Sequence, residues 1–178
     1  MSKGDLRSFI YAHQYLYLTE DEIRKHAKSL ALALVAIHGE GFLHNDVQLS
    51  SVLLHRHKSA GGYTAKLGAL SHARPIGAPA LAQDPNQSTL EGLNGLYKAP
   101  EVILSNGEDL SEASDVWSLG VTLYVSTCGS FPFKTSSDVI NSKIDFNKTR
   151  HGVAFSEPFK NLLIGMLQVD PSSRITLS

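Results

Sequence analysis

One segment of this chain limits its possible folds more than any other. Between Ala113 and Cys128, apolar residues cover most of the surface of a predicted helix. They are Val116, Trp117, Leu119, Val121, Leu123, Tyr124 and Val125. A helix that is apolar nearly all round must be covered on every side, because an exposed face would carry polar residues. The sequence therefore predicts a fold built around one buried central helix over residues 113–128.

Several further helices are predicted around it. Thr19 and Glu22 form a capping box, apolar residues then recur at helical spacing as far as Ile37, and Gly39 ends the segment. Shorter helices are expected over residues 5–12 and 137–144. A last clear helix begins at residue 156, has proline in its first turn and stops before 170–171. Its residues expected to face the core are Phe159, Leu162, Leu163, Met166 and Leu167.

Residues 52–54 and 63–67 have the composition of two short strands, which the loop 57–62 would join as a hairpin. Residues 69–98 contain Gly, Pro, Ser and Asn with little periodicity, and a loop of that length is often functional. The fold class predicted from these elements is mainly α, with one small β-hairpin.

Composition narrows the function classes. A chain of 178 residues with 42% hydrophobic and 19% charged residues is typical of one globular domain. Its net charge of −1 predicts no nucleic-acid partner and no membrane-surface partner. The single Cys128 rules out an internal disulfide and is expected to be a buried apolar residue. The longest apolar run, residues 30–37, is too short to span a membrane, and the N-terminus has no signal-peptide pattern, so a cytoplasmic protein is expected.

Six short segments together resemble the C-terminal lobe of a protein kinase. They follow one another in the order in which that lobe carries its landmarks: G-D-L at 4–6, a catalytic-loop-like segment at 44–54, K-L-G-A-L-S-H-A at 66–73, A-P-E at 99–101, D-V-W-S-L-G at 115–120 and D-P-S-S-R at 170–174. The D-V-W-S-L-G segment is most similar to serine/threonine kinases. The resemblance covers nearly the whole chain. It implies that residues 1–178 are a partial kinase-like domain, without the N-terminal lobe and the last helix.

The resemblance assigns chemical roles to four positions of the catalytic site. Asp46 matches the aspartate that accepts the proton of the substrate hydroxyl. Ser51 stands where an asparagine would bind Mg²⁺, and Ala69 stands where the D-F-G aspartate would bind it. Mg²⁺ requires oxygen ligands, and a methyl group offers none. Gln48 replaces a lysine that would meet the transferred phosphate, so it can donate a hydrogen bond but carries no charge.

Two nearby positions also concern nucleotide and phosphate. Leu53 matches the residue under the adenine ring, although it could equally be an ordinary core residue of a strand. Asn45 replaces the arginine of H-R-D, which pairs with a phosphate on the activation segment, so Ser88 and Thr89 are not expected to be activating phosphosites. Asn94 takes the place of a threonine near the catalytic aspartate.

The other matched residues are expected to hold the lobe together. His44 and Leu70 resemble two stacked residues of the kinase lobe, and no pair of histidines has zinc-like spacing, so no metal site is predicted. Glu101 and Arg174 should form an ion pair. Asp115 should accept backbone N–H groups of the catalytic loop.

Three hypotheses follow. The leading one is a catalytically inactive kinase-like lobe, a pseudokinase, which binds no cofactor and acts as a protein-interaction module; a partner protein would cover the exposed face around Leu53 and Leu70. The second is an ATP- and Mg²⁺-dependent serine/threonine phosphotransferase whose remaining parts lie outside this chain. The third is a truncated product with no function.

Overall fold

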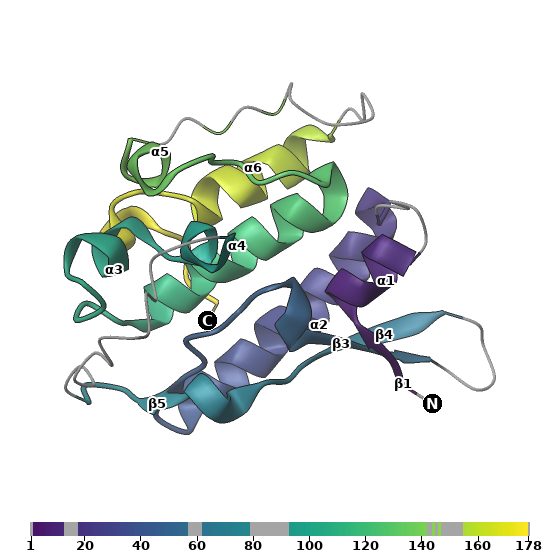
Figure 1. Cartoon of the computed structure of the whole chain (residues 1–178), viewed down its shortest axis with the longest axis horizontal. Coiled ribbons are helices and arrows are strands. Elements are labelled where there is room, and N and C mark those ends of the chain that lie inside the picture. The colour runs from purple at the N-terminus through teal and green to yellow at the C-terminus, as the bar shows by residue number, and fades with distance from the viewer. Residues whose placement is uncertain are drawn as a thin grey trace.

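The computed structural model describes residues 2–12, 18–56, 62–78, 93–141, 144, 146 and 155–177. Helix α4 (Glu112–Cys128) lies between α2 (Glu20–Gly39) and α6 (Glu157–Met166), as Figure 1 shows. From Ser114 to Cys128, every residue of α4 except Ser118 is buried. The prediction of a buried central helix is therefore confirmed, and Cys128 is buried as expected.

Helices α2 and α6 begin at the capping residues that the sequence indicates. The Thr19 hydroxyl accepts a hydrogen bond from the Glu22 backbone N–H at 3.3 Å, and the Glu22 carboxylate accepts one from the Thr19 N–H at 2.9 Å. The Ser156 hydroxyl accepts from the Phe159 N–H at 3.3 Å. These contacts satisfy backbone donors that have no partner inside the helix.

Two short helices flank the central ones. Helix α1 (Leu6–Ala12) follows Asp5, whose carboxylate accepts from the Ser8 N–H at 2.7 Å. Helix α3 (Pro100–Leu104) begins within the A-P-E segment. The sequence did not predict α3, because five residues are too few to show helical periodicity.

Helices α4 and α6 approach closely at Gly120. A Cβ atom at this position would lie 2.9 Å from the Cβ of Met166 and 3.1 Å from Cδ2 of Leu167. Glycine is therefore required here by the space between the two helices, and any side chain would force them apart.

Two helix predictions need correction. Helix α5 (Ser136–Ile140) is shorter than the predicted 137–144, because Asn141 ends it and asparagine is a weak helix former. Leu162 does not face the core as predicted: it is 38% exposed on α6, at the edge of a groove beside α2. The other four predicted core residues of α6 and its end are buried.

The predicted strands are present and belong to a larger sheet. Strands β3 (Val52–Arg56) and β4 (Tyr63–Leu67) pair antiparallel, and most of the loop between them lies outside the described residues. Strand β1 (Ser2–Asp5) pairs with the other edge of β3, which gives the order β1-β3-β4. A separate ribbon joins β2 (Phe42–Leu43) to β5 (Arg74–Pro75). Neither β1 nor this ribbon was predicted.

The described part of the chain also contains four 3-10 helices: η1 (Leu49–Ser51), η2 (Leu70–His72), η3 (Leu93–Tyr97) and η4 (Pro171–Ser173). The two ends of the predicted loop 69–98 thus carry η2 and η3, whereas residues 79–92, with Ser88 and Thr89, lie outside the described part of the chain. The Asn94 side chain is likewise not described. None of the helices that the structure describes is long and apolar enough to cross a membrane.

The C-terminal end of the described chain is fixed to α3 and α4 by Arg174. Its guanidinium donates from Nη1 to Oε1 of Glu101 at 2.7 Å and from Nη2 to Oε2 at 2.9 Å. It also donates to the Ala113 carbonyl at 2.7 Å and lies 5.1 Å from the centre of the Trp117 ring. The guanidinium also donates from Nε and Nη2 to the Gln168 carbonyl, each at 3.0 Å. The Arg174 side chain is 0% exposed, so its charge depends on these partners within the chain.

Replacing Glu101 by alanine should lower the free energy of unfolding by roughly 3–5 kcal/mol, because it leaves a buried guanidinium without its counter-charge. Urea denaturation measures the loss. Arg24→Ala is the matched control, since it breaks an ion pair whose side chains are 73% and 80% exposed, and it should cost about 0.5 kcal/mol or less. Equal losses in the two variants would contradict a structural role for the buried pair.

Candidate functional site

A buried carboxylate on α4 holds the backbone of the segment that resembles the catalytic loop. Oδ2 of Asp115 accepts from the His44 N–H at 2.8 Å, and Oδ1 accepts from the Asn45 N–H at 2.8 Å. Asp115 is 2% exposed. The contacts are those that the sequence predicted for Asp115. Because a buried carboxylate requires hydrogen-bond partners, they fix the loop against the central helix.

Asp115 has a third partner that the sequence analysis missed. Nε2 of His38, near the end of α2, lies 2.9 Å from Oδ2 of Asp115, and the His38 side chain is only 8% exposed. The donor must be an Nε2–H, since a carboxylate only accepts. His38 therefore joins α2 to the same carboxylate that orients the loop. Its position at the end of an amphipathic helix was the one signal in the sequence.

Two further polar side chains of α4 bind neighbouring segments. The Thr122 hydroxyl donates to the Val47 carbonyl at 3.3 Å, and the Ser118 hydroxyl donates to the Tyr97 carbonyl at 2.9 Å. With Asp115, they are spaced at i, i+3 and i+7, so they share one face of the helix. The sequence predicted a helix that is apolar nearly all round and did not indicate this polar face.

His44 links the loop to the end of β4. The ring is 0% exposed; its Nε2 lies 2.8 Å from the Gly68 carbonyl, and its Nδ1 accepts from the Asp46 N–H at 3.2 Å. These two contacts together assign a neutral ring with its proton on Nε2. His44 is therefore part of the packed structure, where the sequence placed it.

The carboxylate of Asp46 is partly exposed, and three neighbouring side chains contact it. Oδ1 accepts from Nε2 of Gln48 at 2.6 Å, and Oδ2 lies 3.3 Å from the Ser51 hydroxyl and 3.5 Å from Nδ1 of His72. The side chain is 23% exposed. The structure thus brings together Asp46, Gln48 and Ser51, as the sequence predicted, and adds His72, which the sequence analysis did not single out.

Ser51 and Gln48 direct their polar groups inward. Ser51 is 1% exposed, and its hydroxyl donates to the Asp46 carbonyl at 2.5 Å. The Gln48 amide is bound to the Asp46 carboxylate as described above. Neither group is free to meet a phosphate or a metal ion without first breaking a contact in the loop.

The backbone of Ala69 has a left-handed conformation, which glycine, asparagine and aspartate adopt more readily than alanine. Its φ and ψ are 60° and 48°, in the left-handed region. A residue with a Cβ is strained there by roughly 1–2 kcal/mol, which Asp and Asn tolerate better than Ala. At the preceding Gly68, a Cβ would lie 2.8 Å from Cδ1 of Leu53, so a larger residue there would require the partly exposed Leu53 side chain to move. The backbone conformation at position 69 therefore suits a short polar side chain, but the residue there carries only a methyl group.

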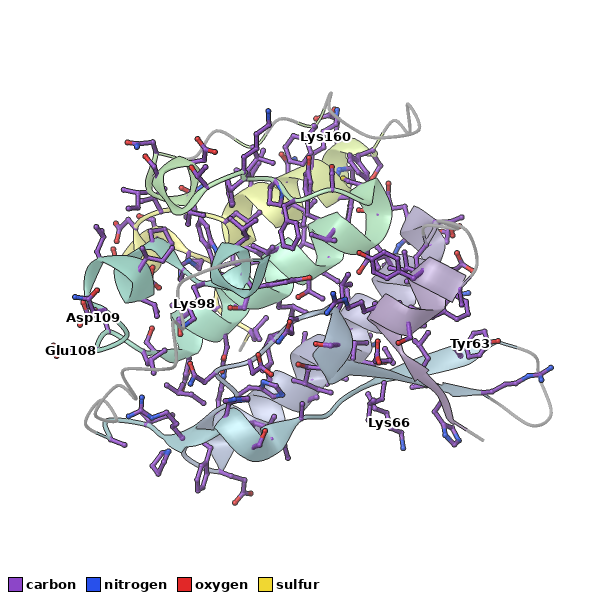
Figure 2. The ribbon with its side chains drawn as sticks, viewed as in Figure 1. Tyr63, Lys66, Lys98, Glu108, Asp109 and Lys160 are labelled. Atoms are coloured by element: carbon purple, nitrogen blue, oxygen red, sulfur yellow. The ribbon has the colours of Figure 1, made fainter. Side chains whose placement is uncertain are left out.

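Burial shifts the pKa of two residues that are adjacent in sequence, Lys98 and Tyr97. Burial lowers the pKa of Lys98, which the nearby Asp46 carboxylate partly offsets. Burial raises the pKa of Tyr97 to about 12. Figure 2 labels Lys98, which lies in the segment leading into α3. Lys98 supplies positive charge near Asp46, and the sequence analysis did not single it out.

The apolar residues Leu53 and Leu70 face outward. Leu53 is 43% exposed on β3 and Leu70 is 55% exposed on η2, as the predicted exposed face requires. The alternative interpretation of Leu53 as an ordinary core residue is therefore wrong. Phe42 and Ile76, on and beside the β2–β5 ribbon, are each 44% exposed. Figure 1 places β1, β3, β4 and β5 along one side of the molecule, away from α5 and α6.

The residues at this site do not fit a Mg²⁺–nucleotide complex. Mg²⁺ in such a site is usually held by one or two carboxylates together with phosphate oxygens. Ala69 offers no side-chain oxygen, and the Ser51 hydroxyl donates to the Asp46 carbonyl within the loop. Among the residues that the structure describes, no group of three or more His, Cys, Asp or Glu side chains could hold a metal ion.

Comparison with known proteins identifies the family. The family model described as "Protein kinase domain" matches residues 1–178, so the chain belongs to the protein kinase domain family. It is 33% identical over 175 residues to maternal embryonic leucine zipper kinase of Xenopus tropicalis, covering 98% of this chain and 25% of that protein. It is 32% identical over 165 residues to CBL-interacting protein kinase 28 of Oryza sativa subsp. japonica, covering 90% of this chain and 35% of that protein.

The fold is also that of a protein kinase. A crystal structure of the Rad53 kinase domain and SCD2 matches with a TM-score of 0.77 and 26% identity, covering 99% of this chain and 60% of that chain. The match with serine/threonine-protein kinase 33 of Bos taurus, 27% identical over 168 residues, covers 90% of this chain and 34% of that protein. The chain thus spans about a third of that relative and of the rice kinase, and a quarter of the Xenopus kinase.

Asp115→Ala should lower the free energy of unfolding by about 3 kcal/mol or more, because it leaves two backbone N–H groups and the His38 N–H buried without an acceptor. Asp46→Ala should cost about 1 kcal/mol or less, since that carboxylate is partly exposed and accepts only side-chain donors. Urea denaturation of the two variants measures both values. The reverse order would contradict the assignment of Asp115 to structure.

Proposed function

We propose that this chain is a kinase-like lobe that transfers no phosphoryl group and acts as a protein-binding module. The observation that carries the proposal is Ala69, which stands in left-handed backbone geometry where the family motif has the metal-binding aspartate. Phosphoryl transfer asks a protein mainly for positioning and for neutralisation of the phosphate charge. A site without that carboxylate lacks the group that would hold the neutralising metal.

The remaining polar groups support the same conclusion. Ser51 donates to the Asp46 carbonyl, Gln48 donates to the Asp46 carboxylate, and His72 lies beside it. Asp46 is therefore placed to brace its own loop, and a substrate hydroxyl would have to displace these neighbours. Removing one preorganised electrostatic group typically lowers a rate by about 10²–10³, and here several groups differ from the family motif, although such losses do not simply multiply.

The exposed apolar residues support the binding role. Leu53 and Leu70 are 43% and 55% exposed, and Gly68, which lies between them in sequence, packs directly against Leu53. Exposed apolar patches of this kind mark contacts with a partner or sites of aggregation. The partner proposed for this face is a protein rather than a nucleic acid or a membrane, because the net charge of the chain is −1. A cytoplasmic location is part of the same proposal.

A second candidate function is serine/threonine phosphotransfer with the missing groups supplied by another part of a longer protein or by a partner. Asp46 favours it, because the carboxylate is retained and 23% exposed, with Lys98 nearby. The relatives named above are kinases, and one of them is serine/threonine-protein kinase 33. This candidate would require another source for the metal carboxylate.

A phosphotransfer assay with Mg²⁺-ATP and generic peptides separates the two functions. The purified chain should show no turnover above background, and ATP should not raise its melting temperature with or without Mg²⁺. Turnover that disappears in Asp46→Asn would overturn the proposal. Ala69→Asp is the informative variant, because aspartate tolerates the backbone of residue 69, and a Mg²⁺-dependent shift confined to this variant would assign the deficit to the missing carboxylate.

Replacing Leu53 and Leu70 by lysine should reduce self-association of the purified chain and its binding of a hydrophobic dye, because the change removes the exposed apolar face proposed for the partner. The free energy of unfolding should change by about 0.5 kcal/mol or less per surface substitution. Leu104→Lys is the matched control: Leu104 is 66% exposed but lies on α3. An equal reduction in this control would show that the Leu53–Leu70 face has no special role.

A further inference from the structure

The dipeptide Asn106-Gly107 lies directly after α3, at the surface of the molecule. Asn106 is exposed, and so are the two acidic residues that follow Gly107. Figure 2 labels these two, Glu108 and Asp109, at the outer edge of the view. An asparagine followed by glycine can lose its side-chain amide without an enzyme, because a residue without a Cβ lets its backbone nitrogen approach the asparagine side chain.

The backbone of the dipeptide closes the C-terminal end of α3. The Asn106 N–H donates to the Ile103 carbonyl at 3.3 Å, and the Gly107 N–H donates to the Val102 carbonyl at 2.8 Å. These two hydrogen bonds form a Schellman motif, in which the first residue beyond the helix cap takes a left-handed backbone. Asn106 has a φ of 54°, and asparagine tolerates that conformation better than most residues. The residue that ends α3 is therefore also the residue that can react.

One of these hydrogen bonds controls the reaction. For the amide to be lost, the Gly107 nitrogen must give up its proton and attack Cγ of Asn106. The new bond closes a succinimide ring, and the side-chain nitrogen leaves as ammonia. Water then opens the ring at one of its carbonyls, which yields aspartate or isoaspartate. Because the Gly107 N–H is bound to the Val102 carbonyl, the turn must open before its nitrogen can attack.

The two products have different effects on α3. Aspartate tolerates a left-handed backbone as asparagine does, so the turn re-forms when aspartate is the product. Isoaspartate carries the main chain through its side-chain carbons and lengthens the backbone by a methylene group, so the hydrogen bond from Gly107 to Val102 is lost. The Ser105 N–H donates to the Glu101 carbonyl at 3.0 Å in the same short helix. Opening of this turn therefore reaches the residue that pairs with Arg174.

From these contacts we propose that Asn106-Gly107 is a modification site. Its deamidation is limited by the opening of the turn that ends α3, and its isoaspartyl product loosens the buried pair of Glu101 and Arg174. The reaction needs only water as a co-reactant. It is independent of whether the Asp46 site transfers a phosphoryl group.

Incubation of the purified chain at mildly alkaline pH, followed by peptide mapping with mass spectrometry, tests the proposal. The mass change from amide to carboxyl should appear at Asn106. Asn161 is the matched control within the chain, because it is also exposed but lies inside α6 and is followed by the bulky Leu162. A synthetic peptide of residues 100–110 should react at least about tenfold faster than the folded chain, because its turn is not held closed. Hydrogen exchange should show protection of the Gly107 N–H by a similar factor.

Glu101→Ala should speed up the reaction at Asn106, because it removes the pair that holds α3, whereas Arg24→Ala breaks only an exposed pair and should not. Urea below the unfolding midpoint should have the same effect on the unaltered chain, which keeps the test valid if Glu101→Ala does not fold. Asn106→Gly should abolish the reaction at this position and keep the fold, since glycine suits the end of a helix.

The proposal is overturned if Asn106 reacts no faster than Asn161, or if the peptide and the folded chain react at the same rate. It is also overturned if neither Glu101→Ala nor urea changes the rate at Asn106. The isoaspartyl form, separated by chromatography, should unfold at a lower urea concentration than the unmodified chain, and an unchanged midpoint would contradict the proposed link to Arg174.

Discussion

The buried carboxylate of Asp115 is the interaction on which the rest of the site depends. It accepts from the backbone of His44 and Asn45 and from the ring of His38, so one group joins α2, α4 and the loop that resembles the catalytic loop. A carboxylate with 2% exposure is stable only with such partners. Asn45 takes a left-handed backbone with φ of 61° in this loop, a conformation that asparagine tolerates better than most residues. The contacts with Asp115 on the central helix therefore determine the conformation of the loop.

The groups that hold the fold and the groups beside the proposed phosphate position differ in their partners. The groups that hold the fold, Asp115 and the Glu101–Arg174 pair, have complete sets of partners. The groups beside the proposed phosphate position, by contrast, bind one another: Gln48 and Ser51 both donate to Asp46. Membership of the protein kinase domain family accounts for the first set, because these residues hold the family fold. Membership does not by itself imply activity, since a fold does not specify a function. The second set supports the proposal that the lobe transfers no phosphoryl group.

The sequence was sufficient to predict α2, α4 and α6, because helical periodicity and capping residues act locally. It did not show β1 or the β2–β5 ribbon, since strands of two to four residues have no readable alternation and depend on partners far along the chain. The contacts of Asp115 with the loop and of Glu101 with Arg174 followed from the family resemblance. His38, Thr122 and His72 were missed, because their roles arise only when the chain is folded. The exposure of Leu162 was not predicted, because helical periodicity shows which residues share a helix face but not how completely neighbouring elements cover that face.

The most direct test of the central claim is a crystal structure of the protein soaked with Mg²⁺ and a non-hydrolysable ATP analogue. The account predicts that no metal ion will be found within about 2.1 Å of a side-chain oxygen of Asp46 or Ser51. It also predicts that Gln48 and Ser51 will keep their contacts with Asp46. A Mg²⁺ ion coordinated there by a protein carboxylate, with the triphosphate beside it, would contradict the account.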